Sequence, residues 1–216
     1  MAGKQRDAFM IYLLVTTHPS RRYPGKNGLL ARFTFDWAAA AALHVQEDVK
    51  IVHAGPFRPS WLPMKVEHIF TRQESESHLD DVLHAERELA PAPGDAMVLA
   101  QLTQPLRHVC LLAEVVEELR RSCRSVITAA VQPSAEWRRT DSKGRWGDKT
   151  TSRTELHHDG TLYAWQPGHA REIFDREFPH AVVRTGCRWA LVDVDQRGDL
   201  PVTLPTLWAH ALHGEP

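Results

Sequence analysis

The stretch DAMVLAQLTQPLR, from Asp95 to Arg107, predicts a strand, a polar loop and the start of a helix. The apolar run Ala96 to Ala100 has the length and flanks of a strand buried on both faces, although periodicity alone also allows a short helix. The polar residues Gln101 to Gln104 follow, and His108 to Arg121 then carries apolar residues at helical spacing. Because open α/β sheets bind ligands at the carboxyl edge, we expect Gln101 to Arg107 to form the floor of an active site.

Working outward from this stretch, apolar runs alternate with helix-prone segments along the chain. This alternation predicts an α/β fold with a mostly parallel sheet in a single domain, residues 1–216. The segment between the second and third strands contains three prolines, so we expect its crossover helix to be short or missing. The expected strands are Ala8–Thr16, Val49–His53, Val66–Phe70, Ser125–Val131, Thr161–Trp165, Ala181–Arg184 and Arg188–Val192. The expected helices are Phe33–Val45, Ser77–Leu89, Gly168–Phe174 and Thr206–Leu212.

Composition and charge exclude several classes of protein. The 216 residues are 43% hydrophobic and 25% charged, which is ordinary for a globular domain. A formal net charge of -1 leaves no footprint for nucleic acid or an anionic membrane, and no apolar run is long enough for a membrane span. The three cysteines have neither disulfide nor zinc spacing, and the N-terminal apolar run resembles a first strand more than a signal peptide. We therefore expect a cytoplasmic protein.

Four polar clusters follow predicted strands, at the edge where α/β proteins bind ligands. The first, Thr17 to Asn27 (THPSRRYPGKN), is basic, contains a glycine and leads into a helix. Backbone N–H groups, a helix N-terminus and cationic side chains can converge there on a polyphosphate. A solvated surface loop explains the same composition equally well. The other clusters are Arg72–Ser77, Gln101–Arg107 and Asp193–Asp195.

A polar insert, residues 133–159, lacks hydrophobic periodicity and is long for a loop inside a compact domain. Such a segment serves as a lid, a binding arm or a dimer contact. Trp137 and Trp146 lie among basic residues and could stack on nucleic acid, but the balanced charge of the chain favours a lid or dimer arm. His157 and His158 have no accompanying ligand spacing for zinc, so we interpret them as an ordinary loop pair.

Four of these sequence elements together resemble the cytidylyltransferases that make CMP-sialic acid and CMP-KDO. Members carry R-x-x-S-K-x-x-x-x-K-N after the first strand, Q-P-T-S-P-L-R after the fourth, then N-G-x-x-Y and a late D-I-D. The corresponding residues here are Ser20, Arg21, Lys26 and Asn27; Gln101 to Arg107; Asp159-Gly160-Thr161-Leu162-Tyr163; and Asp193-Val194-Asp195. The order and spacing hold from about residue 8 to residue 200. The resemblance implies a three-layer α/β/α, nucleotide-diphospho-sugar transferase-like (Rossmann-like) fold.

The resemblance also implies transfer of CMP from CTP to an acidic sugar, with release of pyrophosphate, Mg²⁺ as cofactor and a homodimer as the assembly. Its implied catalytic residues are Lys26, Arg21 and Arg22, which would stabilise the charge on the phosphates. Its implied nucleotide-binding residues are Thr17, Ser20, Asn27, Arg72 and Gln101. Its implied acceptor-binding residues are Thr103, Gln104, Arg107 and Tyr163. Its implied metal ligands are Asp193 and Asp195, whose hard oxygens suit Mg²⁺.

The sequence departs from the family at its first motif. The first-loop arginine corresponds to Thr17, which carries no permanent charge, and Arg22 is the nearby residue that could substitute for it. Two alternatives therefore stay open. One is the same enzyme class with another nucleotide or another hydroxyl acceptor. The other is a nucleotide-binding protein of this fold with reduced turnover.

Overall fold

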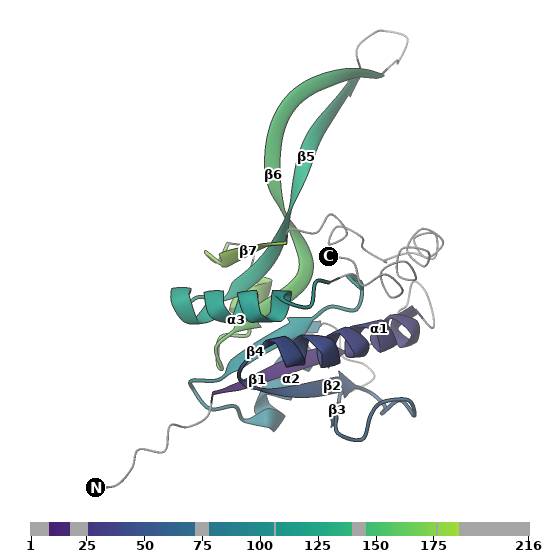
Figure 1. Ribbon diagram of the computed structural model, residues 1–216, viewed down its shortest axis with the longest axis vertical. Coiled ribbons are helices and arrows are strands. Elements are labelled where there is room, and N and C mark those ends of the chain that lie inside the picture. Colours follow the sequence, from purple (N-terminus) through teal and green to yellow (C-terminus); the bar gives the residue numbers. More distant parts are fainter. Residues whose placement is uncertain are drawn as a thin grey trace, which may run out of the picture.

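The computed structural model describes residues 9–17, 26–71, 78–105, 107–139, 146–175 and 177–185. Within them, seven strands form one sheet in the order β3-β2-β1-β4-β6-β5-β7 (Figure 1). All neighbouring pairs are parallel except those of β6, which runs antiparallel to both β4 and β5. The predicted α/β fold with a mixed, mostly parallel sheet is confirmed. The strands are β1 Met10–Thr16, β2 Asp48–Gly55, β3 Glu67–Phe70, β4 Ala96–Ala100, β5 Val126–Arg139, β6 Trp146–Trp165 and β7 Ala181–Thr185.

Helices cover both faces of the sheet and give it three layers. One apolar core cluster joins β1 and β4 to Leu30 and Phe35 of α1 and to Leu112 of α3. The other joins the opposite faces of the same strands to Val82 of α2 and to Ile173 of a short 3₁₀ helix. The helices are α1 Lys26–Ala41, η1 Ala42–His44, α2 His78–Leu89, α3 Leu111–Ser122 and η2 Glu172–Phe174.

Strand β4 is buried on both faces, as its apolar sequence predicts. All five residues of β4, Ala96–Ala100, are buried, because helices pack on both faces and strands lie on both sides. In β1, Leu13 and Val15 belong to one core cluster and Leu14 to the other, as the alternation of side chains along a strand requires. These two strands form the centre of the domain and carry the polar segments that follow them.

The connection from β2 to β3 contains no helix, since residues 56–66 form only turns and irregular structure. Its three prolines predicted this, because proline removes a backbone donor and disrupts helical hydrogen bonding. The carboxyl ends of β1, β2, β3 and β4 meet at one edge of the sheet. That edge is where the sequence predicts the site.

The insert 133–159 is a hairpin rather than an irregular loop. β5 and β6 pair antiparallel from Val131↔Leu156 to Arg139↔Trp146, while β7 pairs with β5 only as far as Ala130. Figure 1 shows this two-stranded arm projecting beyond the body of the domain. The sequence did not predict strands here because the segment is polar and shows no apolar alternation. The structure pairs its two strands through backbone hydrogen bonds, which need no particular side chains.

Two element boundaries also differ from expectation. The helix predicted at Phe33–Val45 begins earlier, at Lys26, so the end of the predicted polyphosphate loop forms its first turn. The helix predicted at Gly168–Phe174 is only the 3₁₀ turn η2, and its predicted first residue, Gly168, has a φ of +90°, outside the helical range. The predicted strand Arg188–Val192 and helix Thr206–Leu212 lie outside the described residues. Within the described ranges, no helix combines the length and apolarity that crossing a bilayer requires.

Candidate active site

The end of β1 is tied to β2 by two hydrogen bonds at Thr17. Its backbone N–H donates to the carbonyl oxygen of Ala54 at 2.8 Å, and its hydroxyl lies 2.6 Å from Nε2 of His53. Gly55 makes room for this contact, because a Cβ at that position would lie 2.5 Å from Oγ1 of Thr17. Thr17, which the motif resemblance aligns with a first-loop arginine, therefore forms a hydrogen bond to a histidine.

His53 is the centre of a polar row across three strands. Its Nδ1 lies 2.8 Å from Nδ1 of His68 on β3, and the two rings are stacked with centroids 4.8 Å apart. Phe35 of α1 contacts the His53 ring edge-on at 5.7 Å. Burial, together with the nearby His68 and Arg58, lowers the pKa of His53 to about 4, so His53 is neutral at pH 7. The row Thr17–His53–His68 thus supplies directed hydrogen bonds without a permanent charge.

After β1, the next element of the chain that the structure describes is helix α1. Lys26 and Asn27 are its first two residues. The first turn of a helix presents N–H groups without intrahelical partners, and the helix dipole favours an anion there. The predicted phosphate contacts Ser20, Arg21 and Arg22, and the predicted base contact Arg72, lie outside the described residues.

Gln101 and Tyr163, which the sequence predicts as site residues from separate motifs, are brought together. The side-chain amide of Gln101 donates to the Tyr163 hydroxyl at 3.3 Å across β4 and β6. Gly160 has a φ of +69°, and a Cβ there would lie 3.2 Å from Oε1 of Gln101. The glycine therefore permits both a tight bend in β6 and the close approach of Gln101.

Arg107 holds the Gln101 loop from the inside. Its side chain is 2% exposed, donates to the backbone carbonyl of Gln101 and to Oγ1 of Thr34, and lies 5.0 Å from the Trp37 ring. Burial lowers the pKa of Arg107 to about 9, against the opposing charge of Asp159, so the guanidinium remains charged at pH 7. Its bonds connect the loop to α1, which gives Arg107 a structural role alongside the predicted contact with the acceptor.

The remaining residues of this loop differ in exposure. Thr103 is half-buried, whereas Gln104 is 5% exposed. The amide oxygen of Gln104 is buried and accepts no hydrogen bond from the part of the chain that the structure describes. An acceptor atom in that state suits a ligand hydroxyl or amine as its partner.

A cavity of about 530 Å³ lies beside Tyr163. Phe174 stacks on the Tyr163 ring at 6.0 Å, and His158 contacts it edge-on at 5.1 Å. Nε2 of His180 bonds to the carbonyl of Asp175 at 3.0 Å, and its Nδ1 is buried without a hydrogen-bond partner among the described residues. The cavity combines aromatic surface with imidazoles, and its lining residues are Ile127, His158, Tyr163, Ile173, Phe174, Asp175 and His180.

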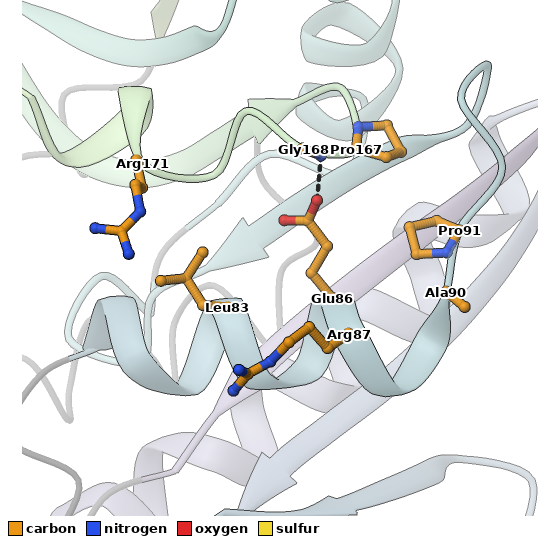
Figure 2. Close-up of a pocket in the computed structure, with 8 residues that line it drawn as sticks. All are labelled: Leu83, Glu86, Arg87, Ala90, Pro91, Pro167, Gly168 and Arg171. Atoms are coloured by element: carbon orange, nitrogen blue, oxygen red, sulfur yellow. Dashed lines mark hydrogen bonds between the residues drawn. The ribbon is translucent and has the colours of Figure 1, made fainter.

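A second cavity, of about 580 Å³, lies at the opposite edge of the sheet between the end of α2 and the turn after β6 (Figure 2). Glu86 enters it, but its carboxylate accepts hydrogen bonds from the Gly168 backbone N–H and, at 3.1 Å, from Nε1 of Trp165. Figure 2 shows Glu86 directed at Gly168. This carboxylate serves the fold, and none of the predicted site residues lines the cavity.

Solved structures with the same architecture identify the fold. A 4-diphosphocytidyl-2C-methyl-D-erythritol synthase from Anaerococcus prevotii DSM 20548 matches 94% of this chain and 100% of its own, with a TM-score of 0.60 and 14% identity. A CMP:2-keto-3-deoxy-manno-octonic acid synthetase complexed with CTP matches 95% and 100%, with a TM-score of 0.61 and 14% identity. The chain shares the fold of these two enzymes. Another 4-diphosphocytidyl-2C-methyl-D-erythritol synthase matches with a TM-score of 0.58 and 11% identity over 93% of this chain and 99% of that one.

No protein-family model and no curated protein sequence matches the chain. The resemblance inferred from four short motifs is therefore confirmed at the level of the cytidylyltransferase fold, by structure and not by overall sequence. A shared fold at 14% identity is possible because buried positions require little more than apolar residues of suitable volume.

The metal ligands remain predictions, because Asp193 and Asp195 lie outside the described residues. Within the described ranges, no three acidic, histidine or cysteine side chains gather as a metal site. Sequence reasoning missed His53, His68 and His180 and interpreted His158 as part of an ordinary loop pair. The usable signal was that His53 and His68 lie in predicted strands; His158 and His180 carry no such signal.

Proposed function

We infer that the chain is a nucleotidyltransferase that transfers CMP from CTP to an acidic sugar of the sialic acid or KDO type, with release of pyrophosphate. One observation carries this inference. Gln101 and Tyr163, predicted as site residues from two motifs, meet at 3.3 Å beside a cavity, in a fold shared with a synthetase solved with CTP. The nucleotide and the acceptor would then meet at the carboxyl edge between β1 and β4.

The nucleotide half of the site would use the amino end of α1. Lys26 and Asn27 begin this helix, so backbone N–H groups and the helix dipole support an anion there. Lys26 with Arg21, Arg22 and Ser20 would stabilise the charge that builds on the leaving pyrophosphate. Pre-positioned charges of this kind contribute most where they face charge that develops in the transition state.

The acceptor half would use the cavity beside Tyr163. Stacked Tyr163 and Phe174 offer an apolar surface for one face of a sugar ring, and His158 and His180 offer hydrogen-bonding nitrogens for its hydroxyl groups. The buried amide oxygen of Gln104 can accept one further hydrogen bond. In the proposed reaction, the acceptor hydroxyl oxygen bonds to the α-phosphorus, the α–β anhydride bond breaks to release pyrophosphate, and the hydroxyl proton passes to solvent.

Asp193 and Asp195 are the residues that we propose to hold Mg²⁺. The two carboxylates are hard oxygen ligands, which is the donor type that this ion prefers. Bound there, Mg²⁺ would supply Lewis-acid stabilisation of phosphate oxygens.

The projecting arm supports a homodimer. A two-stranded hairpin without a third strand or a packed helix is marginally stable in water, and the arm extends beyond the last residues that pair with β7. Packing against a second copy of the chain would stabilise it. It would also place arm residues of one protomer near the acceptor cavity of its partner.

A nucleotide-binding protein with reduced turnover is the second candidate, and Thr17 is the observation that favours it. Thr17 occupies the position of an arginine in the family, and its hydroxyl bonds to the neutral His53. Loss of a charge that stabilises the transition state slows chemistry while leaving nucleotide affinity largely intact. The same enzyme class with another nucleotide or another hydroxyl acceptor is tested by the same assay.

The test is pyrophosphate release by the purified protein with Mg²⁺, each of the four nucleoside triphosphates, and a panel of acidic sugars that includes sialic acids and KDO. Release only with CTP and one acidic sugar is the expected result. Release with a different nucleotide or acceptor selects the alternative within the same class. No pyrophosphate release with any sugar, while CTP still raises the melting temperature, selects the binding protein. No release and no rise in the melting temperature refute both candidates.

Lys26→Ala tests the proposed contact between Lys26 and the phosphates. Its cation would act on the phosphates, so we expect pyrophosphate release to fall at least ~100-fold, in line with the loss of one transition-state contact. The melting temperature without nucleotide should change little, since Lys26 lies in the first turn of α1. Unchanged turnover in this variant would remove Lys26 from the mechanism.

A further inference from the structure

We propose that Asp159 is a positioning residue of the proposed active site, which holds the Gln101 loop (residues 101–107) in place through the buried cation of Arg107. This proposal rests on the proposed function, because Gln101 is one of its site residues. Asp159 is 5% exposed and lies on β6 between the projecting arm and the centre of the sheet, and Arg107 is 2% exposed.

The carboxylate of Asp159 joins the strands β5, β6 and β7. Its Oδ1 accepts hydrogen bonds from the hydroxyl of Thr128 at 2.5 Å and from the backbone N–H of Thr161 at 2.9 Å. Its Oδ2 accepts from the hydroxyl of Thr185 at 2.7 Å. The bond to Thr161 forms a local turn that spans Gly160, whose φ is +69°. These partners all donate, as an ionised carboxylate requires, because such a group only accepts.

A path of hydrogen bonds leads from Asp159 to Arg107. Thr128, at a register shift in β5, donates to Asp159 and accepts from the backbone N–H of Leu162 at 3.0 Å. That N–H belongs to the peptide group between Thr161 and Leu162. The carbonyl oxygen of the same peptide group accepts from Nε of Arg107 at 3.4 Å. A single peptide of β6 therefore links the carboxylate to the guanidinium.

Arg107 and Asp159 carry opposite charges in the interior of the domain. Burying a charge is costly unless hydrogen bonds and an opposite charge compensate for it. The charge of Asp159 opposes the effect of burial, which lowers the pKa of Arg107 to about 9. Arg107 in turn donates to the backbone carbonyl of Gln101 and to Oγ1 of Thr34 on α1. The cation thus holds the Gln101 loop, and Asp159 keeps the cation in place.

The position of the loop matters because the Gln101 side chain reaches the Tyr163 hydroxyl beside the acceptor cavity. A displacement of about 1 Å in a group that orients a reactant can lower a rate by about 100-fold. The N-G-x-x-Y motif has asparagine where this chain has Asp159. An asparagine side chain can form the same turn but carries no charge. The buried counter-charge is therefore a feature of this chain and not of the motif.

The test measures the KM for the acceptor in pyrophosphate release, with CTP, Mg²⁺ and the acidic sugar that supports the fastest release. Asp159→Asn keeps the side-chain shape and the turn but removes the charge. Thr128→Val removes the hydroxyl that links Asp159 to β6, whereas Thr128→Ser keeps it. Thr185→Val is the matched control, because it removes a donor to the same carboxylate that is not on the path to Arg107.

We expect the KM for the acceptor to rise about tenfold in D159N and T128V, because one charge or one hydrogen bond of the path is lost. The rise should stay below about threefold in T128S and T185V, in which the path is intact. An unchanged KM in D159N, or equal KM values in T128V and T128S, overturns the proposal. So does an equal rise in D159N and T185V, which would indicate a general loosening where β5, β6 and β7 meet.

Hydrogen exchange at Nε–H of Arg107, followed by ¹⁵N NMR in the ligand-free protein, distinguishes failure of this proposal from failure of the proposed function. We expect exchange at least tenfold faster in D159N than in T185V and the wild type, because the buried guanidinium opens more often without its counter-charge. If the wild type releases no pyrophosphate, the proposed function fails, and the exchange rates still report whether Asp159 holds Arg107. Equal exchange rates in D159N and the wild type overturn the proposal.

Discussion

Gly160→Ala tests the predicted acceptor side of the site. Gly160 has a φ of +69°, and an added Cβ would lie 3.2 Å from Oε1 of Gln101 and 3.6 Å from the Tyr163 hydroxyl. The substitution therefore has two effects, backbone strain in β6 and displacement of the Gln101 side chain. The second would weaken the 3.3 Å hydrogen bond between Gln101 and Tyr163.

The backbone strain and the weakened hydrogen bond each lower the free energy of unfolding by an amount that can be estimated. A non-glycine residue in the left-handed region costs about 1–2 kcal/mol, and the lower entropy of the unfolded alanine chain returns about 0.4–1 kcal/mol. Weakening one hydrogen bond costs up to about 1 kcal/mol, since the Gln101 side chain is flexible and half-exposed. We expect a net destabilisation of about 1–2 kcal/mol for G160A, above that of strain alone.

Two other glycines provide matched controls. Gly168 also has a positive φ, +90°, but no atom lies within 4 Å of the position that a Cβ would take there, so G168A should show the strain alone, about 1 kcal/mol. Gly28 lies in α1 with nothing within 4 Å, and G28A should raise stability by up to about 1 kcal/mol. Urea unfolding monitored by tryptophan fluorescence measures all three changes.

The difference between G160A and G168A isolates the contact with Gln101. If the two variants are equally destabilised, Gln101 does not approach Gly160 as described, and the reasoning is refuted. In the nucleotidyltransferase assay, G160A should raise the KM for the acceptor while G168A leaves it unchanged. A rise confined to the KM for CTP would move Gln101 from the acceptor side to the nucleotide side.

Two further predictions concern the arm and the buried histidine. Replacing residues 135–152 by Asn-Gly closes the arm at the Ser134↔Arg153 pair, and we expect sedimentation velocity to show a dimer for the wild type and a monomer for this variant. A monomeric wild type would contradict the dimer proposal. His53 has a pKa of about 4 in the folded protein against 6.5 for the free side chain, so the unfolded chain binds more protons between these values. Stability should therefore fall by about 3 kcal/mol as the pH drops from about 6.5 to about 4, and urea unfolding across this range should show a shallower fall for H53Q.

Much of the fold is predictable because the spacing of apolar residues in each segment indicates whether it forms a strand or a helix. The apolar run Ala96–Ala100 and the spacing of Leu112, Val115 and Leu119 reflect which faces are buried, and burial is what shapes such patterns. The arm was not predicted as strands because its pairing is made by backbone groups, which any polar sequence supplies. The helix expected at Gly168–Phe174 is only the 3₁₀ turn Glu172–Phe174, and the positive φ of Gly168 at its expected start is not visible in the sequence.

The candidate site was likewise predicted only in part from the sequence. The sequence by itself indicated which polar segments follow which strands, and so it predicted Gln101 to Arg107 as the floor of a site, whereas Lys26 and Tyr163 were implied by the motif resemblance. It could not place His53 beside Thr17, 36 residues away, or Gln101 beside Tyr163, 62 residues away. Those distances depend on strand order and register, which arise when separate strands pair. No local pattern encodes that pairing, so only the tertiary structure decided which polar groups meet at the edge of the sheet.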